Sequence, residues 1–171
     1  MRINRNLKLM SAYTITASAF FELAVIVPYY HDVMGLTFQD FLIGEAVFAA
    51  VVVILEVPMG WLSDQWQRKH VLALGAFFSL LGHACLLVGD NLAWAIAGQG
   101  VIGIAVALMS GTNTAMIYDS LLVAGQEGDY RRHEGRRGGF SFYTVAVAAV
   151  IGGFLYKLDP HLPLAVTLFF L

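Results

Sequence analysis

Apolar residues occur in long continuous runs along this chain, and short polar stretches separate the runs. Five runs cover residues 9–30, 41–62, 71–89, 92–118 and 140–156. Each approaches or exceeds the ~20 residues that a helix needs to cross a lipid bilayer. The runs lack the alternation of apolar and polar residues that is typical of membrane-spanning β-strands, which excludes a barrel. We therefore predict an all-α fold, a polytopic bundle of transmembrane helices.

A sixth apolar run begins at Pro163 and continues to Leu171. Nine residues are too few to span a bilayer, so the run predicts a sixth helix of which the chain holds only the first part. Six helices suggest two sets of three, the arrangement found as inverted repeats in transporters. The sequences of the two sets of helices show no convincing repeat at the level of single residues. We expect residues 1–171 to form one transmembrane domain that is truncated in its sixth helix, as a natural fragment or as part of a longer protein.

Composition narrows the class of protein further. Apolar residues make up 58% of the chain and charged residues 13%, against about 45–50% and about 25% in soluble domains. The single cysteine, Cys85, permits no internal disulfide and does not make a metal site by itself. Five scattered histidines, with neither a Gly-x-Ser-x-Gly nor a His-Glu-x-x-His motif, argue against a membrane enzyme. We expect no cofactor, no metal and no nucleic-acid partner.

The basic residues predict how the helices are oriented. Nine of the ten lie in the N-terminal stretch and in the connections at 62–70 and 119–139, and the tenth is Lys157. Short loops rich in Lys and Arg stay in the cytoplasm. We therefore expect a multi-pass protein of the cell (inner) membrane, with its N-terminus and these two connections in the cytoplasm.

The connection at 62–70 carries a recognisable pattern, GWLSDQWQRK, which begins at Gly60. It resembles the signature of the major facilitator superfamily, Gly-x-x-x-Asp-(Arg/Lys)-x-Gly-(Arg/Lys)-(Arg/Lys), which lies between helices 2 and 3. Gly60, Asp64, Arg68 and Lys69 match this signature. Gln65 and Gln67 depart from it, because a basic residue and a glycine are usual there. The stretches LEVPMGWLSD, SGTNTAMIYDSL and YRRHEGR are also similar to members of this family.

The resemblance implies the N-terminal half of a twelve-helix transporter, and it implies a gate at this connection. Gly60 would allow a helix of the other half to approach closely. Asp64 would accept from Arg68, and Asp119, at the end of the fourth helix, is placed to be a second acceptor. The alternative is a solvated loop that only obeys the positive-inside rule. Gln67 in place of glycine predicts a slightly different turn.

Charged residues inside the apolar runs are further candidates. Glu22 lies near the middle of the first run, where a lone carboxylate costs at least ~2.5 kcal/mol. We consider two roles for it: proton coupling or substrate binding, and a structural hydrogen bond between helices. Glu45 and Glu56 share one face of the second helix. Glu56 is a further candidate for a coupling or substrate cavity, although a tie to a neighbouring helix is more typical of it.

Three uncharged polar residues add weaker candidates. Asn113 is a candidate for lining a substrate cavity or for bonding across helices. His83 is more typical of hydrogen-bonded packing than of a proton relay. Many proton-driven exporters of the superfamily carry an arginine in helix 4, but the run 92–118 has none, and Gln99 is its nearest polar substitute.

The sequence thus favours a secondary active transporter of small molecules that works by alternating access. Proton-coupled export of drug-like or amphipathic solutes is the narrower hypothesis, motivated by Glu22 and the apolar helices. Nutrient uptake and a non-transporting membrane scaffold of the same fold are the alternatives. The expected partners are the lipid bilayer, a small-molecule substrate, protons, and the C-terminal transmembrane half.

Overall fold

The computed structural model describes residues 2–171, with the side chains of residues 9–171. Its elements are α1 (Arg2–Ala17), α2 (Ile26–Asp32), α3 (Phe38–Gln65), α4 (Arg68–Val88), α5 (Leu92–Leu122), a 3-10 turn (Glu127–Asp129), α6 (Tyr130–Leu158) and α7 (Leu162–Phe170). No strand occurs in this described part of the chain. The predicted all-α fold is confirmed.

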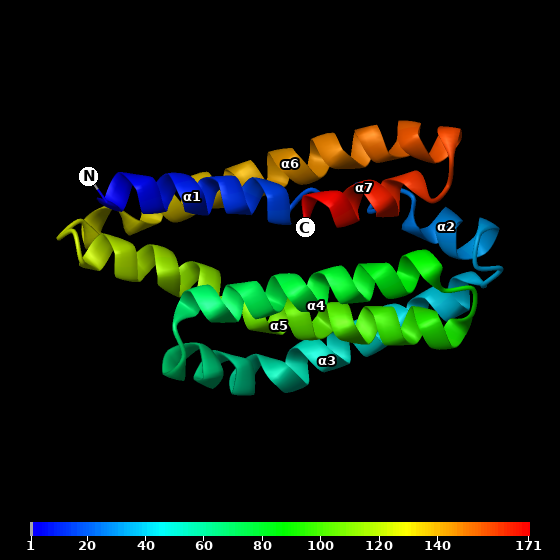
Figure 1. Cartoon of the computed structure of the whole chain (residues 1–171), viewed down its shortest axis with the longest axis horizontal. Helices are drawn as coiled ribbons and strands as arrows, with labels where there is room; N and C mark the ends of the chain where they lie inside the picture. Colours follow the sequence, from blue (N-terminus) through cyan, green and yellow to red (C-terminus); the bar gives the residue numbers. More distant parts are fainter. Residues whose placement is uncertain (1) are drawn as a thin grey trace.

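The helices run along the long axis of the molecule in two groups (Figure 1). One group is α3, α4 and α5, which pack mainly on one another; the other is α1, α6 and α7, and α2 lies beyond them at one end. The connection 66–67, the start of α1 and the α5–α6 connection lie at one end, called here the Arg68 end. The connections 33–37, 89–91 and 159–161 lie at the other, the Asp90 end.

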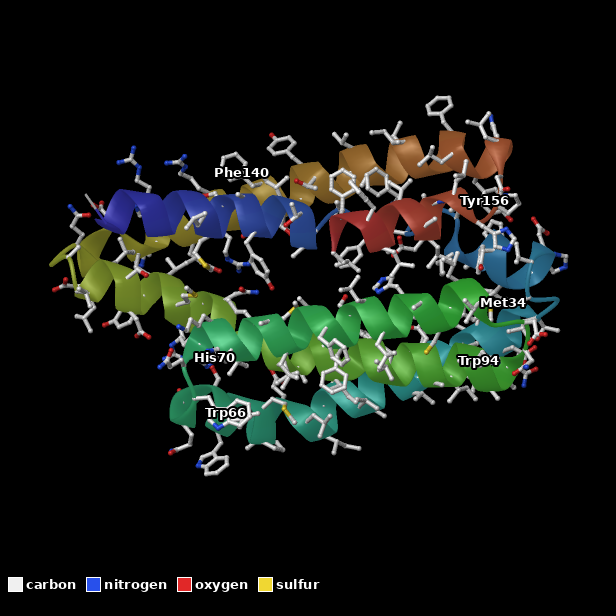
Figure 2. The ribbon with its side chains drawn as sticks, in the orientation of Figure 1. Met34, Trp66, His70, Trp94, Phe140 and Tyr156 are labelled. Atoms are coloured by element: carbon white, nitrogen blue, oxygen red, sulfur yellow. The ribbon has the colours of Figure 1, made fainter. Side chains whose placement is uncertain are left out.

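Four helices are long and apolar enough to cross a membrane: Phe38–Gln65, Arg68–Val88, Leu92–Leu122 and the segment Glu127–Leu158. Large apolar side chains point outward from α3 and α6, among them Val57 and Phe142. Trp66 lies at the Arg68 end and Trp94 at the Asp90 end, both exposed (Figure 2). Tryptophan is enriched at the two membrane–water interfaces. The protein is an integral membrane protein.

Small residues allow the first group of helices to pack closely. A Cβ on Gly82 of α4 would lie 2.9 Å from the carbonyl oxygen of Gly98 on α5. A Cβ on Gly103 would lie 3.0 Å from the Phe48 carbonyl oxygen on α3. Backbones in contact at glycine are typical of membrane helix interfaces. Both glycines therefore hold α5 against its two neighbours.

Side-chain caps fix where the helices begin at the Asp90 end. Thr37 and Asp40 form a reciprocal capping box at the start of α3, and Asn91 accepts from two backbone N–H groups at the start of α5. Before α7, the His161 backbone N–H donates to Asp159 Oδ1 at 2.7 Å. This bond holds the pKa of Asp159 below its usual range. The three connections are thus ordered turns.

Two boundaries differ from those that the sequence indicates. The run 9–30 is not one continuous helix, because residues 18–25 form turns between α1 and α2. The expected connection 119–139 is mostly helical, because α5 continues to Leu122 and α6 begins at Tyr130. Gly125, with φ of 66°, makes the turn between those two helices.

The interruption at 18–25, called here the helix break, is held by contacts with other helices. The Phe21 backbone N–H donates to the Thr167 hydroxyl of α7 at 3.0 Å, and so finds a partner outside its own helix. Gly152 of α6 lies directly against the Phe21 carbonyl, where a Cβ would overlap the carbonyl oxygen. Satisfied donors and close backbone packing stabilise an irregular segment at membrane depth. Hydropathy alone does not reveal such contacts.

Candidate functional site

The Arg68 guanidinium joins three elements at the Arg68 end of the bundle. Its Nε donates to Asp119 Oδ2 of α5 at 2.6 Å. Its Nη1 donates to Ser63 Oγ at 3.2 Å and lies 3.7 Å from Asp64 Oδ1. The short bond thus goes to the distant Asp119, while the neighbour Asp64 is the looser partner. We call Ser63, Asp64, Arg68 and Asp119 the corner cluster.

A buried hydroxyl pair anchors the corner cluster between α3 and α5. The oxygens of Ser63 and Thr112 lie 2.8 Å apart, and both residues are buried. Thr112 also bonds to the Leu108 carbonyl of its own helix. Hydrogen bonds to buried hydroxyls restrict where the guanidinium lies. Sequence reasoning did not select Ser63 or Thr112, since single hydroxyl residues in apolar helices carry little local signal.

The other residues of the signature have no part in these bonds. Lys69 is exposed, and no atom of the described chain lies within 4 Å of a Cβ on Gly60. Gln67 has φ of −67° and ψ of 125°, an ordinary extended conformation. The turn therefore does not need the conformational freedom of the usual glycine. The closer approach of another helix to Gly60 stays a prediction.

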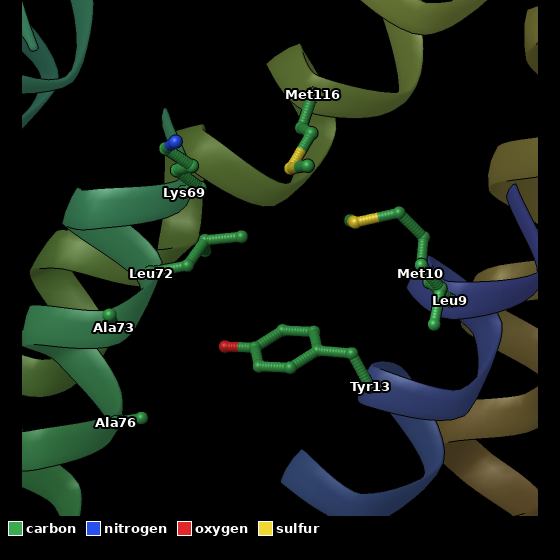
Figure 3. Close-up of a pocket in the computed structure, with 8 residues that line it drawn as sticks. All are labelled: Leu9, Met10, Tyr13, Lys69, Leu72, Ala73, Ala76 and Met116. Carbon is green, nitrogen blue, oxygen red and sulfur yellow. The ribbon is translucent and has the colours of Figure 1, made fainter. Parts of the chain in front are cut away.

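An apolar cavity of about 320 Å³ lies between α1 and α4, next to the corner. Figure 3 shows Tyr13 reaching from α1 toward α4, with Lys69 and Met116 at one side. The Tyr13 hydroxyl is buried and has no hydrogen-bond partner in the described part of the chain. Loose packing here separates α1 from α4, while α4 and α5 remain in close contact.

The helix break places Glu22 between two other elements, α4 and α7. Glu22 is 7% exposed, and its Oε1 lies 3.3 Å from Nε2 of His83 on α4. Its second oxygen accepts from the hydroxyl of Thr167 on α7. His83 is also buried, and its ring stacks on Phe20 at a centroid distance of 5.9 Å. We call Glu22, His83 and Thr167 the break cluster.

The bond of His83 to its own helix determines which ring nitrogen faces Glu22. Nδ1 lies 2.7 Å from the Ser79 carbonyl oxygen. A carbonyl oxygen only accepts, so Nδ1 carries a hydrogen. Nε2 therefore is the nitrogen that faces Glu22 Oε1, at 3.3 Å. The two groups form an ion pair whenever His83 is protonated and Glu22 is ionised.

A second carboxylate lies in the same region. A cavity of about 270 Å³ is lined by Glu22 and His83, and also by Glu45 of α3 and Gln99 of α5. The Gln99 side-chain N–H donates to Glu45 Oε1 at 2.6 Å. The structure therefore connects Glu22 to residues that sequence reasoning considered separately, and it adds Thr167, which sequence reasoning missed.

Glu56 and Asn113 do not join these groups. Glu56 is exposed on α3 and has no polar partner in the described part of the chain. Asn113 is half-buried, with a buried Oδ1 that lacks a hydrogen-bond partner among the described residues. Neither residue lines the cavity that holds Glu22. The three candidates that the sequence offered for one cavity thus lie at three places.

The fold and these clusters define a polytopic helical membrane protein with a charged corner at one end and buried titratable groups at the helix break. The model of the Major Facilitator Superfamily matches residues 9–171, so the chain belongs to this family. Its members are membrane transporters and not enzymes.

One relative adds to this assignment. Over 81 residues the chain is 35% identical to an uncharacterized transporter of Buchnera aphidicola subsp. Schizaphis graminum (strain Sg). The match covers 42% of this chain and 20% of that protein. The chain therefore matches about a fifth of the relative's length.

Proposed function

We propose that this protein is a secondary active transporter that moves small molecules across a membrane by alternating access. Membership of a transporter family and the similarity to an uncharacterized transporter support this proposal. The narrower proposal is proton-coupled export of amphipathic or drug-like solutes. The single observation that carries it is the contact between Glu22 and His83, which are buried together where the first helix is interrupted.

Proton coupling would use the geometry of the break cluster. With a proton on His83, the pair would hold the helix break against α4, because the imidazolium would attract the carboxylate at 3.3 Å. Without the proton, the two acceptors repel, and the break is released from α4. Interrupted helices with bound ions are typical of coupling sites in transporters. The cavity between the break and α4 gives the pair contact with a solute.

The corner cluster would act as the gate at its end of the bundle. Arg68 joins the α3–α4 corner to the end of α5 through Asp119. Such a tie holds one end of the bundle closed, and exposed ion pairs of this kind break at small cost. We place the Arg68 end in the cytoplasm, because nine of the ten basic residues lie in the segments that meet there. The N-terminus would then be cytoplasmic, and the membrane the cell (inner) membrane.

The test uses the full-length protein in sealed liposomes, with flux of a lipophilic fluorescent solute measured at several proton gradients. Glu22→Gln should remove the dependence of flux on the gradient, because an amide cannot take up or release the proton. His83→Gln should have the same effect. Flux that still follows the gradient in both variants would show that the break cluster is structural.

Glu56→Gln is the matched control for this test. It also removes a carboxylate from a transmembrane helix, but Glu56 is exposed and lies outside the break cluster. Flux in this variant should depend on the gradient as in the wild type. Equal loss in Glu56→Gln and Glu22→Gln would contradict a specific role for Glu22. The direction of gradient-driven flux separates export from uptake.

A further inference from the structure

The cavity beside the helix break combines apolar walls with a few polar groups. It measures about 270 Å³ and lies between residues 20–26 and the helices α3, α4 and α5. Its polar side chains are Glu22, Glu45, His83 and Gln99. A concave apolar site with few converging polar groups is typical of small-molecule binding sites. The volume is slightly below the range typical of drug-sized ligands, so it suits a small solute.

The charges of these four side chains do not cancel. Glu22 lies 3.3 Å from His83, the one side chain of this lining that can become positive. Glu45 bonds to Gln99, an amide without charge. No Lys or Arg is among the described residues that line the cavity. Glu45 is partly buried, and its partner in this cavity is an amide and not a cation. A positively charged ligand would therefore be a favourable partner for its carboxylate.

The surroundings of Glu45 suit a bulky cation. Phe20 and Phe48 line the cavity with Ile102, and aromatic faces attract organic cations.

We propose that this cavity binds a small monovalent organic cation with an apolar body, and that Glu45 is its counter-ion. Gln99 positions the carboxylate by donating to Oε1, and leaves Oε2 for the cation. Phe20 and Phe48 contact the apolar body. The inference rests on the proposed transport function in one respect, since it makes the bound cation the transported substrate.

The test measures binding and transport separately, on the full-length protein. Binding of radiolabelled benzyltrimethylammonium in lipid nanodiscs is compared with that of neopentylbenzene, which has the same shape and no charge. The wild type should bind the cation at least about tenfold more tightly, because only the cation pairs with Glu45. Equal binding of the two probes would overturn the proposal, and this comparison needs no variant.

Variants then assign the counter-ion. Glu45→Gln should reduce the preference for the cation by about tenfold, while Glu56→Gln, on the same helix and outside the cavity, should keep it. The elution profile and melting temperature of each variant confirm that it is folded. Loss of the preference in Glu22→Gln and not in Glu45→Gln would transfer the role to Glu22 and overturn the assignment.

Flux measurements keep this proposal distinct from the transport proposal. Cation binding that depends on Glu45, without flux of any solute in liposomes, would leave the site standing and contradict the transport function. Gradient-driven flux of other solutes, without preferential binding of the cation, would support transport and overturn the site. Flux of the cation that falls in Glu45→Gln supports both.

Discussion

The corner cluster and the break cluster are built in opposite ways. At the corner, Arg68 and Asp64 lie one helical turn apart in the sequence, and their side chains are partly exposed. At the break, Glu22 meets His83 and Thr167, which lie far away in the sequence and are buried with it. The corner thus combines a local pair with one distant acceptor, Asp119, whereas every contact of the break cluster joins distant parts of the chain.

This difference has an energetic consequence. Exposed ion pairs contribute little to stability, typically about 0–1 kcal/mol. Buried polar groups that lose a partner cost about 1–3 kcal/mol each. Changes at the break should therefore act on both folding and transport. Changes at the corner should act on transport with little effect on folding.

The largest expected effect is that of Gly152→Ala, which adds one methyl group where α6 touches the helix break. Its Cβ would overlap the Phe21 carbonyl oxygen, and neither backbone can move away without disturbing its helix. We expect a loss of about 3 kcal/mol, at the upper end of overpacking costs. The apparent melting temperature in detergent, followed by size-exclusion chromatography, measures this loss.

Gly153, the next residue of α6, is the matched control for that substitution. A Cβ there would meet no atom within 4 Å. Gly153→Ala should be neutral or stabilising by up to about 1 kcal/mol, because alanine favours helix. A melting temperature lowered equally in Gly152→Ala and Gly153→Ala would show that the close contact with Phe21 does not determine the loss.

A smaller loss is expected for Thr167→Val, which keeps the shape of the side chain and removes its hydroxyl. The Phe21 N–H then loses its acceptor, and Glu22 loses a donor. The cost should be about 1–3 kcal/mol, seen as a lower melting temperature. Thr167→Ser retains the hydroxyl and should restore most of the stability. A Thr167→Val protein as stable as the wild type would show that the break needs no bond from α7.

The sequence predicted the fold class well because hydropathy reports directly on helices that face lipid. It also selected Arg68, Asp64 and Asp119, since their spacing and charge stand out against apolar neighbours. The partners of the corner, Ser63 and Thr112, were not predicted, because their bond depends on how α3 and α5 pack at small residues such as Gly103.

The break cluster shows where reasoning from a single sequence ends. Glu22 stood out as a charge in an apolar run, and the one local breaker of the run 9–30 is Pro28, which lies in the first turn of α2 and not at the end of α1. No proline or glycine lies between residues 17 and 27, so no local signal ends α1 at Ala17. Contacts with Gly152 and Thr167 from distant helices determine the break. Tertiary contacts of this kind override local helix propensity.

The smallest effect on stability is expected at the corner, for Asp119→Asn and Asp64→Asn. Asp119 is half-exposed and Asp64 is more exposed still, so either change should alter the free energy of unfolding by less than about 1 kcal/mol. Flux in liposomes should nevertheless fall, because the amide weakens the tie that we propose as the gate. Membrane insertion should remain as in the wild type.

The sizes of the two flux losses distinguish a specific tie from a general effect of charge. Arg68 bonds to Asp119 at 2.6 Å but lies 3.7 Å from Asp64. Asp119→Asn should therefore reduce flux by about fivefold, the equivalent of ~1 kcal/mol. Asp64→Asn should reduce flux by less. Unchanged flux in both variants would remove the gate from the mechanism. A larger loss in Asp64→Asn would mean that Asp64 bonds to a partner other than Arg68 during transport. Both variants should also melt at the temperature of the wild type, because we expect the corner cluster to support transport without supporting the fold. A lowered melting temperature in either variant would contradict this difference between the corner cluster and the break cluster.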